Sequence, residues 1–246
     1  MEINWESQVL SSVSKVIPKL SCLEIDIDKL HEVAAELSED SFSINYEGNT
    51  NTVPKEYIRK TMLINTLNFV FTDFLTSVKY KIENYSDTDA MVYQIDKALD
   101  QGIPLTQGRF MRDMNLKEFK TLFTGNIVMP MADEKVKILN NVGDILVTKY
   151  GGDWINFIDD GPKKLYDNGK GLVERLVRDF KRFDDHSIFE NEKVYFLKLA
   201  QLAFWGIHRE LSKRYFYIED MENMTAFADY IIPVALESFG IVKYSS

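Results

Sequence analysis

The spacing of apolar residues along the chain predicts a mainly helical fold. In five stretches, apolar side chains recur every three or four residues, which is the repeat of one face of an α-helix. A sixth stretch, residues 62–75, is the most apolar, but polar residues interrupt it, so we interpret it as a core helix and not as a membrane span. The five periodic stretches are residues 92–101, 135–150, 172–180, 191–211 and 225–239.

Strand signals are few. Residues 41–46 alternate between polar and apolar, which predicts a short strand, and residues 215–218 are a weaker candidate. Residues 47–54 and 159–171 are rich in Gly, Asn and Pro and are expected to be flexible loops. No internal repeat or low-complexity segment interrupts the chain. We therefore predict one compact, mainly α unit over residues 1–246, with a few short strands.

Composition narrows the class of protein. Hydrophobic residues make up 45% and aromatic residues 13% of the 246 residues, which excludes intrinsic disorder. With 29 Lys and Arg against 38 Asp and Glu, the net charge of −9 argues against binding of duplex nucleic acid, which needs clustered cations. The net charge does not exclude binding of a single nucleotide, which needs only a few local hydrogen-bond donors. Cys22 alone excludes a disulfide framework, and we expect a packed thiol there.

The N-terminus and the histidines exclude further classes. The first residues are acidic and lack the basic and apolar segments of a signal peptide. We therefore expect a cytoplasmic protein that does not bind a membrane. His31, His186 and His208 lie far apart in the sequence, so no metal site is predicted.

The C-terminal third carries the most informative charges. Lys198, Gln201 and Trp205 share one face of the predicted helix 191–211, within an aromatic and apolar run. A buried ammonium without a partner is very costly, so Lys198 is expected to pair with a carboxylate. The carboxylates that follow it in the chain include Asp220, Glu222 and Asp229.

Asp229 is distinctive among these carboxylates. It lies between aromatic residues of the predicted last helix, where loss of solvent raises the pKa of a carboxyl unless a cation compensates. Pro233 has no N–H, so the Asp229 carbonyl lacks its helical partner. A Lys and an Asp in an aromatic pocket suit a heterocycle held between rings, with charge beside its glycosidic carbon. A purely structural ion pair is the alternative, and the residues alone leave both open.

Six segments resemble motifs of the queuosine salvage protein family, in the same order along the chain. The segment MTAFADYIIP at 224–233 resembles the family's LT-x-FADYR-x-P, and FLKLAQ at 196–201 is similar to its LLKRAQ helix. Together the six segments span about residues 40–246. The other four are FKRFDD at 180–185, LNFVF at 67–71, ALDQGIP at 98–104 and YGGDW at 150–154.

This resemblance implies an enzyme without a cofactor. It would hydrolyse the N-glycosidic bond of queuosine 5′-monophosphate and release queuine, a 7-deazaguanine base used in tRNA modification. It also implies a helical fold related to helix-hairpin-helix DNA glycosylases. By position, Asp229 corresponds to the catalytic carboxylate and Lys198 to its charged partner. The predicted substrate-binding residues are Asn68, Phe69, Phe71, Tyr230, Asp185, Asp220, Gln201, Trp205 and Tyr46.

The chain also departs from the family pattern. Two family arginines are replaced by Ile231 and Leu199, and Gly206 stands where the family has Asp. The missing arginines bear on phosphate recognition, so a related 7-deazaguanine nucleotide or nucleoside is an open alternative substrate. A non-catalytic nucleotide- or base-binding protein of the same fold is a second alternative, and a helical scaffold for a protein partner is a third. The other departures are Val234 for Gln, Thr72 for Trp, and Asn45-Tyr46 for a His-Tyr pair.

Overall fold

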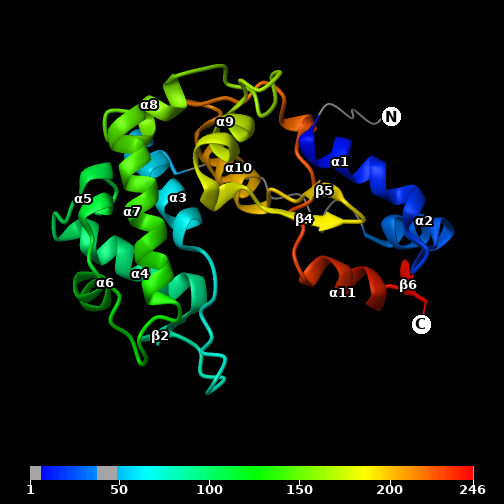
Figure 1. The fold of residues 1–246 in the computed structure, drawn as a ribbon, viewed down its shortest axis with the longest axis horizontal. Helices are drawn as coiled ribbons and strands as arrows, with labels where there is room; N and C mark the ends of the chain where they lie inside the picture. The colour runs from blue at the N-terminus through cyan, green and yellow to red at the C-terminus, as the bar shows by residue number, and fades with distance from the viewer. Residues whose placement is uncertain (1–6, 38–48, 246) are drawn as a thin grey trace.

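The computed structural model describes residues 7–37 and 49–245, and its fold is mainly α, as predicted (Figure 1). The predicted strand 41–46, which includes Tyr46, lies outside the described residues. None of the helices in the described part of the chain is both long and apolar enough to cross a bilayer. The α-helices are α1 (Gln8–Val16), α2 (Ile27–Glu36), α3 (Pro54–Leu67), α4 (Asp87–Asp100), α5 (Gly108–Asp113), α6 (Leu116–Leu122), α7 (Ala132–Lys149), α8 (Trp154–Asp159), α9 (Leu172–Asp179), α10 (Lys198–Leu211) and α11 (Ile231–Ser238).

The strands in the described part of the chain form three short antiparallel pairs. One of them joins segments from near both ends of the chain, and Figure 1 shows α1 and β6 on the same side of the molecule. The pairs are β1 (Leu23–Ile25) with β6 (Val242–Tyr244), β2 (Lys81–Ile82) with β3 (Tyr85–Ser86), and β4 (His186–Phe189) with β5 (Glu192–Tyr195).

Among residues 7–37 and 49–245, buried hydrophobic side chains form two clusters, against which the helices pack. The large cluster runs from Val9 to Ile218 and includes residues of α3, α7, α9 and α10. The small cluster contains Val33, Ile241 and Val242, and Leu236 of α11 packs against it. Helix α10 packs on α3 and α9, whereas α11 packs on β6. Helix α10, which begins with Lys198, therefore packs in the large cluster, whereas α11, which follows Asp229, packs against the small one. A single compact unit over the whole chain stays a prediction.

Three helices agree with the hydrophobic pattern, and another, α3, begins and ends eight residues before the predicted helix 62–75. Helices α4, α7 and α9 confirm residues 92–101, 135–150 and 172–180, although α4 begins five residues earlier. The core helix predicted at 62–75 is wrong beyond Leu67, where α3 ends. Phe74 and Leu75 are 79% and 96% exposed, because the chain after α3 turns into a loop closed by a bridge between Thr72 and Lys79.

The helix predicted at 191–211 is wrong in its first seven residues. Strand β5 and β4 form a hairpin there, and α10 begins only at Lys198. Glu190 and Asn191 connect the strands with φ of +46° and +68°. Positive φ at both central residues is the signature of a tight hairpin turn, which Asn favours and a helix cannot contain.

The last predicted helix also begins later than expected. Helix α11 begins at Ile231, so Pro233 lies in its first turn, where a missing N–H leaves no helical bond unmade. Two smaller predictions are wrong. Residues 215–218 form no strand, because the backbone N–H of Ile218 donates to Nδ1 of His208. Cys22 is exposed and is not a packed thiol.

Gly143 allows α5 and α7 to pack closely. A Cβ at Gly143 would lie 2.2 Å from the backbone nitrogen of Arg112 and 2.5 Å from the carbonyl oxygen of Gly108. We expect Gly143→Ala to lower the free energy of unfolding by about 1–3 kcal/mol in urea titrations. The control is Gly206→Ala on α10, where the nearest atom is 3.6 Å from the added Cβ. Because Ala favours a helix over Gly by about 1 kcal/mol, this variant should be no less stable than the wild type. Equal destabilisation of both variants would contradict the packing argument.

Candidate active site

Lys198 and Asp229 form an ion pair. Nζ of Lys198 lies 2.5 Å from Oδ2 of Asp229, and the two side chains are 29% and 25% exposed. Lys198 is the first residue of α10, and Asp229 lies two residues before α11 begins. The expected carboxylate partner of Lys198 is therefore Asp229, although it sits before the last helix and not within it.

The surroundings of Asp229 favour its ionised form. The hydrogen bond from Lys198 holds the pKa of the Asp229 carboxyl below its usual value and outweighs burial, which acts in the opposite direction. The backbone N–H of Ile231 also donates to Oδ1 at 2.8 Å. Asp229 is therefore a carboxylate at neutral pH, with both oxygens bound by donors.

A strained turn places Lys198. Leu197, which precedes it, is fully buried with φ of +52°, in the left-handed region that branched side chains rarely adopt. The carbonyl oxygen of Asp185 accepts from the backbone N–H groups of Phe196 and Leu197, at 3.0 and 3.3 Å. An ammonium at the N-terminus of a helix opposes the helix dipole. The position of Lys198 is therefore stabilised by Asp229 and not by the helix that carries it.

Gln201 and Trp205 hold the segment that leads to Asp229. Oε1 of the buried Gln201 accepts from the backbone N–H of Thr225 at 2.9 Å, and its Nε2 lies 2.9 Å from Oγ1 of Thr225. The ring of Trp205 meets Phe227 edge to face, with 5.8 Å between centroids. Lys198, Gln201 and Trp205 thus share one face of α10, as predicted, and in the structure that face contacts residues 225–229.

An apolar groove of about 520 Å³ opens beside the pair. Asp185 and Asp229 are the carboxylates in its lining, and most other lining residues are aliphatic. Phe196 and Tyr244 are its aromatic residues; Phe69, Phe71, Trp205 and Tyr230 are not part of this lining. Tyr230 is 79% exposed. The groove therefore differs from the ring-lined cavity that the sequence suggested.

Asn68, Phe69 and Phe71 form a second group, directly after α3. Two cations missed by the sequence reasoning surround it: Lys135 of α7 and Arg182, which precedes β4. The Asp185 carboxylate acts electrostatically on Arg182, so this arginine connects the second group to the groove. Two features of the sequence could have indicated these residues. Lys135 interrupts the apolar stripe of α7, and Arg182 lies within the motif-like segment FKRFDD.

Asp220 lies elsewhere. It is buried, and its carboxylate accepts from the backbone N–H groups of Leu165 at 2.6 Å and Tyr166 at 3.1 Å. Asn223 donates to it as well, at 3.2 Å. These bonds fix the loop before α9, and none of them connects Asp220 to the Lys198–Asp229 pair.

Burial of Lys135 predicts a pH-dependent stability. Burial, and secondarily the charge of Arg182, lowers the pKa of Lys135 from 10.5 to about 7, while the carboxylate of Glu134 opposes them. Between these two values the unfolded chain binds the extra proton, so the free energy of unfolding should rise with pH, by up to about 1.4 kcal/mol per pH unit. Urea titrations at pH 7, 8 and 9 measure this slope, and Lys135→Met should remove it. Parallel profiles for the two proteins would contradict the shift.

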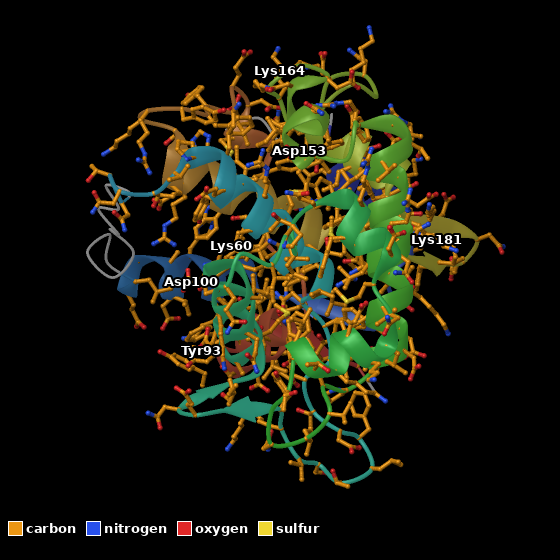
Figure 2. The ribbon with its side chains drawn as sticks, turned by 90° about the vertical axis from the view of Figure 1, so that its left-hand side faces the viewer. Lys60, Tyr93, Asp100, Asp153, Lys164 and Lys181 are labelled. Atoms are coloured by element: carbon orange, nitrogen blue, oxygen red, sulfur yellow. The ribbon has the colours of Figure 1, made fainter. Side chains whose placement is uncertain are left out.

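A second, polar hollow of about 680 Å³ lies where the motif-like segments 98–104 and 150–154 meet. Arg59 of α3 binds Asp153 there through two nitrogens, with Nη2 2.6 Å from Oδ2. Figure 2 looks onto this face, where Lys60, Asp100 and Asp153 are labelled. This polar hollow and the apolar groove beside the Lys198–Asp229 pair share no lining residue. Within residues 7–37 and 49–245, no three His, Cys, Asp or Glu side chains converge as metal ligands.

Comparison with known proteins places these residues in a family. A family model described as "Queuosine salvage protein" matches residues 45–246. Three relatives named queuosine 5′-phosphate N-glycosylase/hydrolase are similar to the chain. The mouse protein is 30% identical over 192 residues (74% of this chain, 55% of the relative), and the cow protein is 27% identical over 220 residues (86% and 63%). The Sphaerobacter thermophilus protein is 24% identical over 242 residues (96% and 74%). The chain thus spans less than two thirds of the mammalian relatives' length. The extent of the family match nevertheless shows that the chain belongs to the queuosine salvage protein family.

Proposed function

We propose that this protein is an N-glycosidase that hydrolyses queuosine 5′-phosphate, or a related 7-deazaguanine nucleotide or nucleoside, and releases queuine. The observation that carries the proposal is the Lys198–Asp229 pair, 2.5 Å apart beside a groove, in segments that resemble the family motifs. The substrate class comes from the names of the relatives.

The proposed reaction needs two opposite charges. The bond between C1′ of the ribose and the glycosidic nitrogen breaks, and its electron pair leaves with the base. Positive charge therefore develops on the ribose and negative charge on the base. Water then adds its oxygen to C1′, and the departing base is protonated. Stabilisation of charges that exist only in the transition state accelerates such a step.

Asp229 and Lys198 match these charges. In the proposal, the ionised Asp229 lies near C1′, where it stabilises the oxocarbenium-like ribose or activates water. Lys198 supplies positive charge to the departing base. Because the two groups already bind one another, the substrate enters a site whose charges are held before it arrives.

The remaining predicted residues bind the substrate in this proposal. Aromatic side chains stack on the base, each ring contributing about 1–3 kcal/mol. Asn68 and Asp185 offer polar groups near the aromatic segment and the groove. The aromatic set consists of Phe69, Phe71, Tyr230 and Trp205, and Tyr46, Gln201 and Asp220 complete the predicted residues.

A non-catalytic binding protein is the second candidate function. Ile231 and Val234 replace a family Arg and Gln, and they are 54% and 61% exposed at the start of α11. Apolar side chains there cannot bind a phosphate. If the protein only binds its ligand, the replacement of the family arginines by Ile231 and Leu199 follows from the loss of hydrolysis.

One pair of measurements separates the two functions. The protein is incubated with queuosine 5′-phosphate and, separately, with queuosine, and free queuine is followed by chromatography while calorimetry measures binding. Release of queuine supports the glycosidase. Tight binding without release supports the binding protein, and neither binding nor release contradicts both. The ratio of kcat/KM for the two substrates shows whether the 5′-phosphate is recognised.

A further inference from the structure

Lys135 is a buried lysine that forms no salt bridge within the described residues. Its side chain is on α7, the residue is 0% exposed, and Nζ donates to the backbone carbonyl oxygens of Phe69 and, at 3.2 Å, of Val70. Nζ also lies 3.7 Å from the ring centroid of Phe69 and 5.1 Å from that of Phe71. Carbonyl oxygens and ring faces therefore take the place that a carboxylate usually has beside a buried ammonium.

Arg182 binds the same segment from another element. Its Nε donates to the carbonyl oxygen of Thr66 at 2.7 Å, and Nη2 donates to that of Asn68 at 3.3 Å. Its Cζ lies 4.6 Å from the centroid of the Phe69 ring. The last carbonyls of a helix have no helical partner and form the negative end of its dipole. Lys135 and Arg182 thus donate to four carbonyls at and just beyond the C-terminus of α3.

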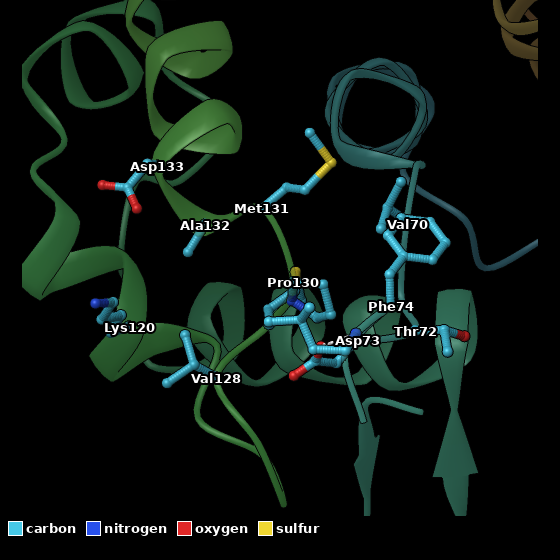
Figure 3. A pocket seen from close by; sticks show the side chains of 12 residues that line it. Val70, Thr72, Asp73, Phe74, Lys120, Val128, Pro130, Met131, Ala132 and Asp133 are labelled. Atoms are coloured by element: carbon cyan, nitrogen blue, oxygen red, sulfur yellow. Dashed lines mark hydrogen bonds between the residues drawn. The ribbon is translucent and has the colours of Figure 1, made fainter. Parts of the chain in front are cut away.

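The segment they hold is strained. Val70 has φ of +44°, a conformation that β-branched residues adopt only when their surroundings impose it. Val70 also lines a hollow of about 370 Å³, together with Phe74 and Met131 (Figure 3). Because the carbonyl of Val70 itself binds Lys135, the cations are well placed to impose this conformation.

We propose that Lys135 and Arg182 are positioning residues of the site, which fix the rings of Phe69 and Phe71 for stacking on the base of the substrate. The inference rests on the proposed function. Neither cation is assigned contact with the reacting atoms. Both act on the rings through the backbone of residues 66–70, and both contact the Phe69 ring directly.

The test compares Lys135→Met and Arg182→Gln with a matched control, Lys137→Met, which removes an exposed lysine from the same helix. With queuosine 5′-phosphate as substrate, the first two variants should raise KM by about tenfold or more and leave kcat within about threefold, because stacking affects binding and the Lys198–Asp229 pair is untouched. The control should match the wild type. Reduced kcat per folded molecule with unchanged KM would overturn the proposal.

A double-mutant cycle with Phe69→Leu asks whether cation and ring act together. Phe69→Leu should raise KM in the wild type by a factor similar to that of Lys135→Met. In the Lys135→Met background it should add less than about threefold, because the ring is already misplaced. Effects that multiply independently would overturn the proposal. If Lys135→Met does not fold, the same cycle is run with Arg182→Gln.

Hydrogen exchange provides a readout that does not depend on turnover. Backbone amides within residues 68–71 should exchange about tenfold faster in the folded Lys135→Met protein, while those of α10 keep their wild-type rates. Unchanged exchange at 68–71 would overturn the positioning role even if the wild type is active. Absence of queuine release by the wild type would instead refute the proposed function, so the two failures are distinguishable.

Discussion

Asp229→Asn is expected to reduce queuine release from queuosine 5′-phosphate by about 10³-fold, within the range typical of losing an acid–base or charge-stabilising group. Asparagine keeps the size of the side chain and an oxygen that can accept from the backbone N–H of Ile231. It removes the negative charge that the proposed transition state needs. Chromatographic assay of kcat per folded molecule measures the effect.

The fold should survive this substitution. The Lys198–Asp229 pair is about a quarter exposed, and pairs open to solvent contribute about 1 kcal/mol or less to stability. The thermal midpoint of Asp229→Asn should therefore stay within a few degrees of the wild type. Glu237→Gln, which neutralises an exposed carboxylate on α11, is the control and should keep full activity. Wild-type turnover by a folded Asp229→Asn or Asp229→Ala protein would end the assignment.

The ionised state of Asp229 also sets the acid limit of activity. Its pKa lies below the usual 3.8, mainly because Lys198 donates to it. A group that works as a carboxylate loses its function as pH falls through its pKa, so titration of Asp229 should leave the plot of kcat/KM against pH flat as pH falls to about 5. With queuosine, which has no 5′-phosphate to titrate, an acid limb near pH 6 would indicate that a protein group other than Asp229 controls the reaction.

Local pattern was sufficient for α4, α7 and α9, but it misplaced an end of α3, α10 and α11 and did not mark α1, α2, α5, α6 and α8. Periodicity reports which face of a segment is buried, and it located α4, α7 and α9. It did not separate β5 from α10, because Val194 and Leu197 are buried in either arrangement. The deciding feature was the turn at Glu190 and Asn191, whose positive φ angles become evident only when the strands pair.

In the candidate site, the sequence predicted the ion pair but not the basic residues that bind backbone carbonyls. The need of Lys198 for a carboxylate follows from the chemistry of its own neighbourhood, and the structure supplies Asp229. Lys135 and Arg182 were missed because their partners are backbone carbonyls of residues 66–70, far away in the sequence. Carbonyls are present at every residue, so no side-chain pattern marks the ones that a cation will bind. Such contacts follow from the tertiary packing of α7 against the end of α3.

Lys198→Met is expected to lower kcat by about 10²-fold, the lower end of the range for losing one charged catalytic group. Methionine keeps the length of the side chain and removes the ammonium. It also removes the main cause of the lowered pKa of Asp229, so the acid limb of kcat/KM should move to higher pH than in the wild type. Lys213→Met, which removes an exposed lysine just after α10, is the control. Unchanged activity per folded molecule would show that Lys198 only stabilises the fold.

Lys198→Arg separates the two ways in which Lys198 can assist the departing base. Arginine keeps a positive charge beside Asp229 but does not release its proton at any pH at which proteins are folded. If Lys198 acts as a fixed charge, Lys198→Arg should retain much more activity than Lys198→Met, with an acid limb close to that of the wild type. If Lys198 protonates the base, the two variants should be equally impaired at every pH. Because both variants lengthen or preserve the side chain, a collapsed site does not explain either result.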